Sequence, residues 1–187
     1  MNVVIFGPPG AGKGTQAHNI SKKYKLYQVS TGDLLRNEVK NQTDIGKVIE
    51  NIISKGDFAT DVIVNELIKN VVFDPLKKNK LIFDGYPRSL SQAENLDFLL
   101  DNSKQKIDFI FYLNVKKDTI LKRIEKRKIL EKRADDNSST ILKRYDTYME
   151  TTKPVLDFYS KKSNFYEIDG DQKIEEISSK IEQILSV

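Results

Sequence analysis

The 187-residue sequence contains no cysteine, no tryptophan and a single histidine, His18. Without cysteine the chain has no disulfide, no thiolate metal site and no cysteine nucleophile, and one histidine cannot build a histidine metal cluster. No apolar run approaches the roughly 20 residues that a membrane-spanning helix needs. The N-terminus has neither the basic segment nor the small-residue cleavage site of a secretory signal peptide. We therefore expect a soluble, cytoplasmic protein with no membrane partner.

A large excess of one charge is also missing. The chain has 31 Lys and Arg residues against 27 Asp and Glu, a net charge of +4. This mild positive excess fits a phosphate-bearing ligand, but it is too small and too mixed in sign to indicate nucleic acid. The length favours one domain with a sizeable core.

Short apolar runs alternate with helical patterns along the chain. Strands are expected at residues 3–6, 27–29, 81–83, 107–113 and 165–168. Helices are expected near residues 13–24, 32–40, 45–53, 60–71, from Ser89 onward, 118–127, from a start within 135–139 to 159 with a kink or boundary at Pro154, and 174–185. Ser30 or Thr31 would cap the second helix, and Ser89 with Gln92 matches a capping box. The alternation predicts an α/β fold: a five-stranded parallel sheet with helices on both faces and ligands at the carboxyl ends of the strands.

A glycine-rich loop at residues 7–15 follows the first strand and opens the first helix. Its glycines let backbone N–H groups converge on an anion beside the positive end of the helix, and Lys13 can reach terminal phosphate oxygens. Gly14 stands where the general phosphate-loop motif has Ser or Thr, and Thr15 comes one position later. The alternative is a tight turn without a ligand. The position between strand and helix favours a phosphate-binding loop (P-loop).

Polar residues also follow the second and third predicted strands. Thr31 can bond a base or sugar and Arg36 can hold a phosphate; taken alone, a helix cap and a solvated arginine fit these two residues better. Asp84 comes directly after a buried strand, where it can hold magnesium through water. Arg88 follows on a proline-anchored turn, from which it could clamp a phosphate. The alternative for Arg88 is a surface arginine on an ordinary turn.

Four arginines of the later chain form the last group: Arg123, Arg127, Arg133 and Arg144. By default the basic run 116–133 would be a solvated face or a nucleic-acid patch, but its interspersed acids and lack of aromatic residues disfavour the latter. Phosphoryl transfer gives another reason for arginines, since developing charge on the phosphate oxygens must be matched by fixed cations. No histidine, cysteine or paired-carboxylate arrangement competes for the chemistry.

Together these segments resemble the adenylate kinases, within the nucleoside monophosphate kinase family. Four motifs carry the resemblance in order and spacing: GPPGAGKGTQA at 7–17, STGDLLR at 30–36, DGYPRSLSQAE at 84–94 and RADD at 133–136. The resemblance covers essentially the whole chain. It implies a single P-loop kinase domain over residues 1–187, with a helical monophosphate-binding (NMP-binding) insert at 30–59 and a very short lid at 126–136.

The resemblance also implies two nucleotide sites. ATP would be bound by Gly10, Ala11, Gly12, Lys13, Gly14, Thr15, Arg123, Arg127 and the backbone of Gln172. AMP would be bound by Thr31, Arg36, the backbone of Asp57, Phe58 and Ala59, and by Gly85, Tyr86, Pro87, Arg88, Gln92, Arg133 and Arg144. The catalytic group would be Lys13, Arg88, Arg123, Arg133 and Arg144. The cofactor would be Mg²⁺ with ATP, and Asp84 would be its water-mediated ligand.

Two features depart from the family pattern. The stretch before Thr60 and Asp61 usually carries Leu-Val, whereas this chain has Asp57-Phe58-Ala59. The lid has neither the length nor the cysteines of the longer, zinc-holding lids, so we expect no zinc site.

The leading hypothesis is an adenylate kinase that converts MgATP and AMP to two ADP by direct in-line transfer, without a covalent intermediate, and so serves adenine nucleotide homeostasis. A UMP/CMP kinase would run the same chemistry on another acceptor, although Thr31 and Gln92 favour AMP. A nucleotide-gated switch protein is a further alternative, but it would need no second phosphate clamp of the kind that Arg36, Arg88 and Arg144 offer. We expect a monomer that binds ATP and AMP and no nucleic acid.

Overall fold

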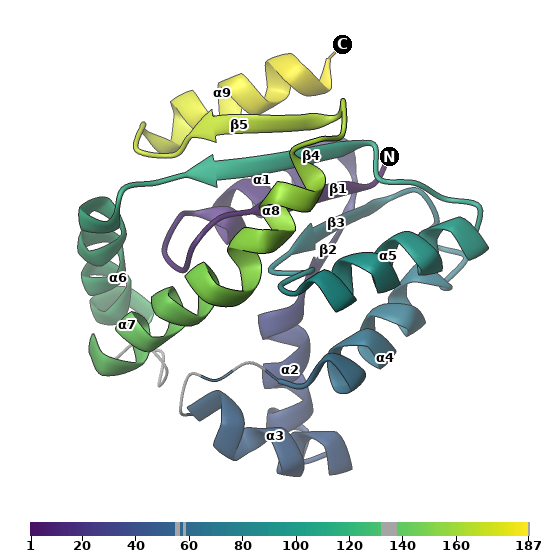
Figure 1. The fold of residues 1–187 in the computed structure, drawn as a ribbon, viewed down its shortest axis with the longest axis horizontal. Coiled ribbons are helices and arrows are strands. Elements are labelled where there is room, and N and C mark those ends of the chain that lie inside the picture. The colour runs from purple at the N-terminus through teal and green to yellow at the C-terminus, as the bar shows by residue number, and fades with distance from the viewer. Residues whose placement is uncertain (55–56, 58, 132–137, 187) are drawn as a thin grey trace.

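The computed structural model describes residues 1–54, 57, 59–131 and 138–186, with the backbone alone at 53–54, 127–131 and 138–141. Its centre is a five-stranded, all-parallel sheet in the order β2-β3-β1-β4-β5 (Figure 1). The strands are β1 Val3–Phe6, β2 Tyr27–Ser30, β3 Leu81–Asp84, β4 Phe109–Asn114 and β5 Phe165–Asp169. The predicted fold class is confirmed. β4 begins two residues later than predicted, and ahead of it the N–H of Asp108 donates to the Asn2 carbonyl oxygen at 2.8 Å.

Helices connect the strands, and most lie close to their predicted positions. They are α1 Lys13–Tyr24, α2 Thr31–Lys40, α3 Asp44–Ser54, α4 Asp61–Val72, α5 Leu90–Asn102, α6 Lys117–Glu131, α7 Ser138–Thr147, α8 Lys153–Tyr159 and α9 Ile174–Leu185. A π-helical turn, η1 Tyr148–Thr152, separates α7 from α8. The boundary predicted at Pro154 lies one residue earlier, where η1 gives way to α8 at Lys153, although the helical conformation continues through it. Pro154 lies in the first turn of α8, the position in a helix that best tolerates proline. Within the described chain, no helix combines the length and apolar character needed to cross a bilayer.

Side chains of the central strand enter two separate cores on opposite faces of the sheet. Val4 and Phe6 pack into one core, formed with apolar residues of α4, α5 and α8. Val3 and Ile5 pack into the other, formed with α1, α6 and α9. Successive strand residues point to opposite faces, so a strand that is apolar at every position must be covered on both sides. The continuous apolar run of β1 therefore explains why helices flank both faces.

The helix pair α2 and α3 projects away from the sheet, at the bottom of Figure 1. Ser30 caps α2, since its hydroxyl accepts a hydrogen bond from the Asp33 N–H at 3.2 Å. The Thr31 hydroxyl instead donates to the Gly85 carbonyl oxygen. This decides between the two predicted cap residues in favour of Ser30. The division of the chain into an insert at 30–59 and a lid at 126–136 stays a prediction; residues 126–131 belong to α6, and 132–136 lie outside the described residues.

The strand register brings the predicted ligand segments to one edge of the sheet. Asp84 at the end of β3 pairs with Ile5 of β1 on one side and with Ser30 of β2 on the other. The glycine loop after β1, the start of α2 and the turn after β3 therefore adjoin one another. This is the carboxyl edge, where parallel sheets place their ligands.

Candidate active site

A cavity of about 400 Å³, counting its open mouth, lies at this carboxyl edge. Its lining comes from β1 and the glycine loop, from the turn after β3, and from the α7–η1 segment: Ile5, Phe6, Gly7, Pro9, Lys13, Gly85, Pro87, Arg88, Arg144, Tyr148 and Thr152. Three residues of the predicted catalytic group, Lys13, Arg88 and Arg144, thus line one cavity although 131 positions separate the first from the last. Tyr148 and Thr152 were not predicted.

The glycine loop has the geometry of an anion site. Gly10 has φ +82°, and a β-carbon there would lie 2.7 Å from the Ile124 side chain, so only glycine fits. No side chain caps the N-terminus of α1, whose first turn begins at Lys13. The Lys13 ammonium donates to the carbonyl oxygens of Gly7 and Pro8 at 2.8 and 3.0 Å. The loop, the helix N-terminus and a cation therefore meet at one point, an arrangement that binds phosphate.

Arg123 joins the glycine loop to the loop before α9. One guanidinium nitrogen donates to the Ala11 carbonyl oxygen at 3.1 Å, and the other donates to the Gln172 carbonyl oxygen at 3.3 Å. Arg123, Ala11 and Gln172 come from three distant segments and were all predicted to contact ATP. The structure brings them together; their role in ATP binding stays a prediction.

Asp84 lies against the start of α1. A β-carbon on Gly14 would be 3.3 Å from one Asp84 carboxylate oxygen, which also accepts a long hydrogen bond from the Gln28 amide at 3.3 Å. Glycine at position 14 thus leaves room for this carboxylate beside the phosphate loop. Within the described residues no group of three or more His, Asp or Glu side chains could hold a metal ion. A single carboxylate fits Mg²⁺ that takes its remaining ligands from water and phosphate.

Positive charge is concentrated around Arg88. Its pKa is lowered to about 10 by desolvation first and then by the nearby cation of Arg144, with Arg36 adding to the effect and Asp84 opposing it. Its Nε donates to the Gly85 carbonyl oxygen at 2.7 Å, which fixes the guanidinium along the turn. Gly85 has φ +78°, and a β-carbon there would lie 2.9 Å from the Arg88 guanidinium. The site therefore holds cations that repel one another and that a bound anion would stabilise.

Thr31 and Arg36, the two predicted AMP contacts on α2, have different surroundings in the structure. Thr31 is 4% exposed and its hydroxyl supports the turn after β3 through the bond to Gly85. Arg36 pairs with Asp33 on the same helix at 2.6 Å and remains partly exposed. A partly exposed Arg36 agrees with the alternative interpretation of a solvated arginine, although its charge still acts on Arg88.

Gln92 lies one turn into α5 and is 3% exposed. Ser89 caps the helix, accepting from the Gln92 N–H at 3.1 Å. The predicted capping box is wrong in its second half, because the Gln92 side-chain oxygen accepts from the N–H of Arg88 at 2.7 Å and not from that of Ser89. The Gln92 side-chain nitrogen donates to Asp61, whose other oxygen accepts from the Ser89 hydroxyl. Asp61 was not predicted as part of the site.

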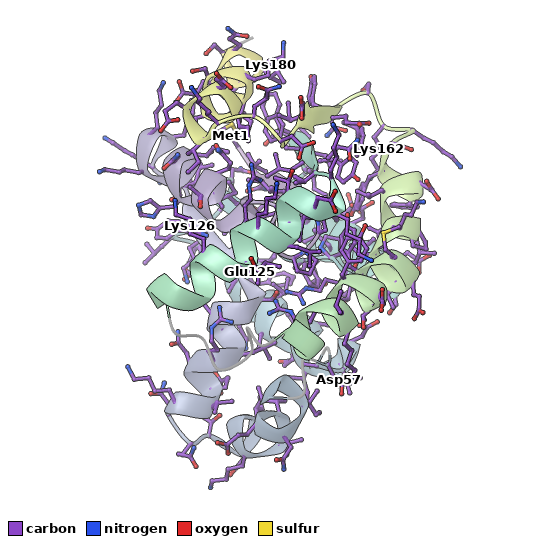
Figure 2. All side chains as sticks on the ribbon, turned by 90° about the vertical axis from the view of Figure 1, so that its left-hand side faces the viewer. Met1, Asp57, Glu125, Lys126, Lys162 and Lys180 are labelled. Atoms are coloured by element: carbon purple, nitrogen blue, oxygen red, sulfur yellow. The ribbon has the colours of Figure 1, made fainter. Side chains whose placement is uncertain are left out.

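The segment between α3 and α4 reaches across to α7. The Asp57 carboxylate forms an ion pair with Lys143 at 2.6 Å, and in Figure 2 Asp57 lies beside the lower end of the green helical segment that contains α7. Ala59 is buried. The predicted residues Phe58 and Arg133 lie outside the described residues, as does the side chain of Arg127. Tyr86, also predicted, is buried, and its hydroxyl donates to Asn65 and accepts from Asn95.

Two further residues of the π-helical turn complete the site. The Thr152 hydroxyl donates to the Arg88 carbonyl oxygen at 3.0 Å and so holds the turn after β3 from the other side. Tyr148 is buried, and desolvation followed by its neighbour Tyr112 raises the pKa of its hydroxyl well above the ordinary value. Sequence reasoning missed both, because a π-helical turn has no sequence signature of its own.

Comparison with known proteins gives a consistent result. A sequence model of the family described as adenylate kinase matches residues 5–164. The chain is similar to an adenylate kinase of Pelagibacter ubique, 47% identical over the full length of both chains. An adenylate kinase of Azobacteroides pseudotrichonymphae is 42% identical over 97% of this chain and 95% of the relative, and one of Archaeoglobus fulgidus is 36% identical over 99% and 98%. The Pelagibacter alignment runs over 213 positions against 187 residues here, so that relative contains residues without a counterpart in this chain.

Proposed function

The chain belongs to the adenylate kinase family and is an enzyme, a nucleoside monophosphate kinase, and on this premise we propose that it transfers the terminal phosphoryl group of MgATP directly to AMP to give two ADP. Family membership supports phosphoryl transfer between ATP and AMP. We place this reaction in the cavity at the carboxyl edge because Lys13, Arg88 and Arg144 all line it. Lys13 belongs to the glycine loop and Arg88 to a separate turn, so in our proposal each of these two elements binds one of the two reacting phosphate groups. A switch protein or a simple hydrolase needs only the first of these.

The proposed mechanism works by position and charge. The glycine loop and the N-terminus of α1 hold the phosphates of ATP, and Lys13 moves its ammonium from the Gly7 and Pro8 carbonyls to a terminal phosphate oxygen. Arg88 clamps the phosphate of AMP, with its guanidinium oriented by Gly85. Arg123, Arg133 and Arg144 add further positive charge in this proposal. Of these three, Arg133 is not among the residues that the structure describes. These cations stabilise the charge that spreads over the transferred group in the transition state.

Magnesium fits the site beside Asp84. In our proposal the Asp84 carboxylate, next to Gly14, holds the ion through water. Bound Mg²⁺ would neutralise charge on the ATP phosphates.

The proposed transfer needs no covalent intermediate. The sequence has no cysteine, and its one histidine, His18, is an exposed residue of α1. When two nucleotides are bound end to end, the acceptor oxygen of one lies in line with the bond to the leaving group of the other. The enzyme then holds both reactants in a fixed geometry, so the transfer does not depend on a chance encounter between them.

We propose adenine as the acceptor base because of the side chain of Gln92. Its amide carries donor and acceptor together, which matches the amino group and adjacent ring nitrogen of adenine. A pyrimidine acceptor, as in UMP/CMP kinases, would use the same phosphate clamp. Gln92, held one turn beyond Arg88, favours AMP.

We further propose that residues 30–59 act as the insert that covers AMP and residues 126–136 as a very short lid over ATP, in a cytoplasmic monomer that maintains the balance of adenine nucleotides. The Pelagibacter alignment is 26 positions longer than this chain, and a shorter lid would account for such a difference. The ion pair of Asp57 with Lys143 supports contact between the insert and the helix that follows the lid.

An acceptor panel tests the function. The purified enzyme is given MgATP with AMP, CMP, UMP or GMP at equal concentration, and ADP formation is followed in a coupled assay. AMP should give the highest kcat/KM. A higher value for CMP or UMP would replace the adenylate assignment by a pyrimidine one, and absence of transfer to every acceptor would refute the kinase site.

A further inference from the structure

Asp61, in the first turn of α4, uses both carboxylate oxygens on the segment that carries Gln92. One oxygen accepts from the Gln92 side-chain nitrogen at 2.7 Å and the other accepts from the Ser89 hydroxyl at 2.8 Å. Gln92 is 31 positions further along the chain and is 3% exposed. A buried amide with a charged partner from another helix is held far more firmly than an amide in solvent.

The two partners of Gln92 allow only one orientation of its amide. The N–H of Arg88 can only donate, so the atom 2.7 Å from it must be the carbonyl oxygen. A carboxylate can only accept, so the atom that faces Asp61 must be the NH₂ group. A flip of the amide would place N–H against N–H at one end and oxygen against carboxylate at the other. Asp61 therefore adds a second penalty to the flipped state.

This orientation has a chemical consequence for the base. The two bonds use one N–H and one carbonyl lone pair of Gln92, and the amide has a second of each. The positions of the remaining N–H donor and the remaining carbonyl lone pair of Gln92 are therefore fixed relative to each other and to the site. Adenine and cytosine present an amino donor beside an unprotonated ring nitrogen, whereas hypoxanthine, guanine and uracil present a carbonyl acceptor beside a ring N–H. An amide locked in one orientation can complement only one of these two patterns in a given pose of the base.

We propose that Asp61 is a positioning residue that fixes the Gln92 amide and thereby makes the acceptor site selective for amino bases over oxo bases. The inference rests on the proposed function, because it takes Gln92 to face the acceptor base. Asp61 acts through Gln92 and needs no contact with the nucleotide.

The sharpest probe is IMP, which differs from AMP only where an oxo group and a ring N–H replace the amino group and the bare ring nitrogen. The measurement is the ratio of kcat/KM for AMP to that for IMP in the wild-type enzyme and in the Asp61→Asn variant. Asn is isosteric with Asp but can accept or donate, so the flipped amide loses one of its two penalties. We expect a large ratio in the wild type and a ratio at least about tenfold smaller in the variant, the scale of one charge-assisted hydrogen bond.

The matched control is Asp97→Asn. Asp97 lies on α5, accepts from Lys162 at 2.7 Å and from the Tyr159 hydroxyl, and has no place in the proposed site. This variant should leave the AMP-to-IMP ratio unchanged, even where it lowers the melting temperature. The KM for ATP should stay unchanged in both variants. If Asp61→Asn does not fold, Asp61→Glu, which keeps the charge but displaces the oxygens, should lower the ratio in the same direction.

The possible results distinguish a failure of the proposed function or of the role of Gln92 from a failure of the role proposed for Asp61. A wild-type enzyme that uses IMP as well as AMP would refute the role of Gln92 at the acceptor base, and the inference with it, whereas absence of transfer to any acceptor would refute the proposed function. A wild-type enzyme that strongly prefers AMP, with a ratio that stays within twofold in folded Asp61 variants, would overturn the role of Asp61 and leave the function standing. A smaller ratio in the Asp61 variants alone, at constant KM for ATP, supports the inference.

Discussion

The Thr31 hydroxyl donates a hydrogen bond to the carbonyl oxygen of Gly85 at 2.8 Å, across 54 positions of sequence. The same oxygen accepts from the Nε of Arg88 at 2.7 Å. The start of α2, the turn after β3 and the guanidinium that would clamp the acceptor phosphate are therefore coupled through one carbonyl group. A change at Thr31 should act on the position of Arg88.

Thr31→Val removes this hydroxyl while keeping the shape of the side chain. The KM for AMP should rise by about 2- to 10-fold, the scale of one neutral hydrogen bond, because the turn is less well held. Steady-state kinetics with each nucleotide varied in turn provide the measurement. The KM for ATP should not change. Thr151→Val, which removes an exposed hydroxyl bonded only to its own helical turn, is the control, and an equal effect of both variants would contradict the coupling.

Lys13→Met should reduce kcat by several orders of magnitude, since a cation is removed from the developing charge on the transferred group. The side chain bonds to two loop carbonyls that remain partly exposed to water, so the fold should survive. Circular dichroism and the melting temperature establish that it does. Near-normal turnover in a folded variant would disprove the role of the phosphate loop.

Arg88→Met should abolish most of the activity without lowering the stability of the free protein. Desolvation and the neighbouring cations Arg144 and Arg36 disfavour the charge of Arg88 in the folded state, and this is why its pKa falls to about 10. Below pH 10 the charged form dominates, so the folded protein carries this penalty at neutral pH and its removal offsets the lost bond to Gly85. The melting temperature of the free variant should equal or exceed that of the wild type, and the increase caused by AMP should be absent. A large loss of stability, or an effect confined to ATP, would contradict this assignment.

The ion pair between Asp57 and Lys143 should affect AMP more than ATP, because Asp57 belongs to the segment proposed to cover AMP. Both side chains are about half exposed, so the pair contributes less than about 1 kcal/mol and Lys143→Glu should raise the KM for AMP by no more than about 5-fold. The effect should diminish at high salt. The double variant Asp57→Lys with Lys143→Glu should restore the wild-type value.

The pair of Lys23 with Glu182, which joins α1 to α9 with similar exposure, is the control for this charge swap. Lys23→Glu should leave both KM values unchanged. If the swapped Asp57 and Lys143 variant performs no better than the single one, the two charges do not act on each other in solution.

The sheet and the helices could be predicted because their signals are local. Val3–Phe6 is apolar at every position, which indicates a strand covered on both faces, and α9 begins and ends where its isoleucine spacing predicted. Lys13 and Arg88 could also be predicted, because each lies in a short motif directly after a strand. A parallel sheet then brings the ends of its strands to one edge.

The contacts that the sequence could not give are those between distant helices. Asp61 looks like an ordinary acid in a first helical turn, and only the packing of α4 on α5 shows that its partners are Gln92 and Ser89. The capping box at Ser89 failed for the same reason, since tertiary contacts drew the Gln92 side chain to Arg88. The π-helical turn that contains Tyr148 and Thr152 could not be predicted, because no local sequence pattern is typical of such a turn.

The central claim is that two nucleotides bind end to end across Lys13 and Arg88, and a compound with two adenosines joined by five phosphates tests it most directly. Linking the two ligands makes the second binding event intramolecular, so the compound should bind at least about 100-fold more tightly than ATP or AMP alone. Isothermal calorimetry should give one compound per protein, and prior saturation with either ATP or AMP should weaken its binding. Affinity no greater than that of ATP, with competition from ATP alone, would contradict the account, because it would leave the protein with a single nucleotide site.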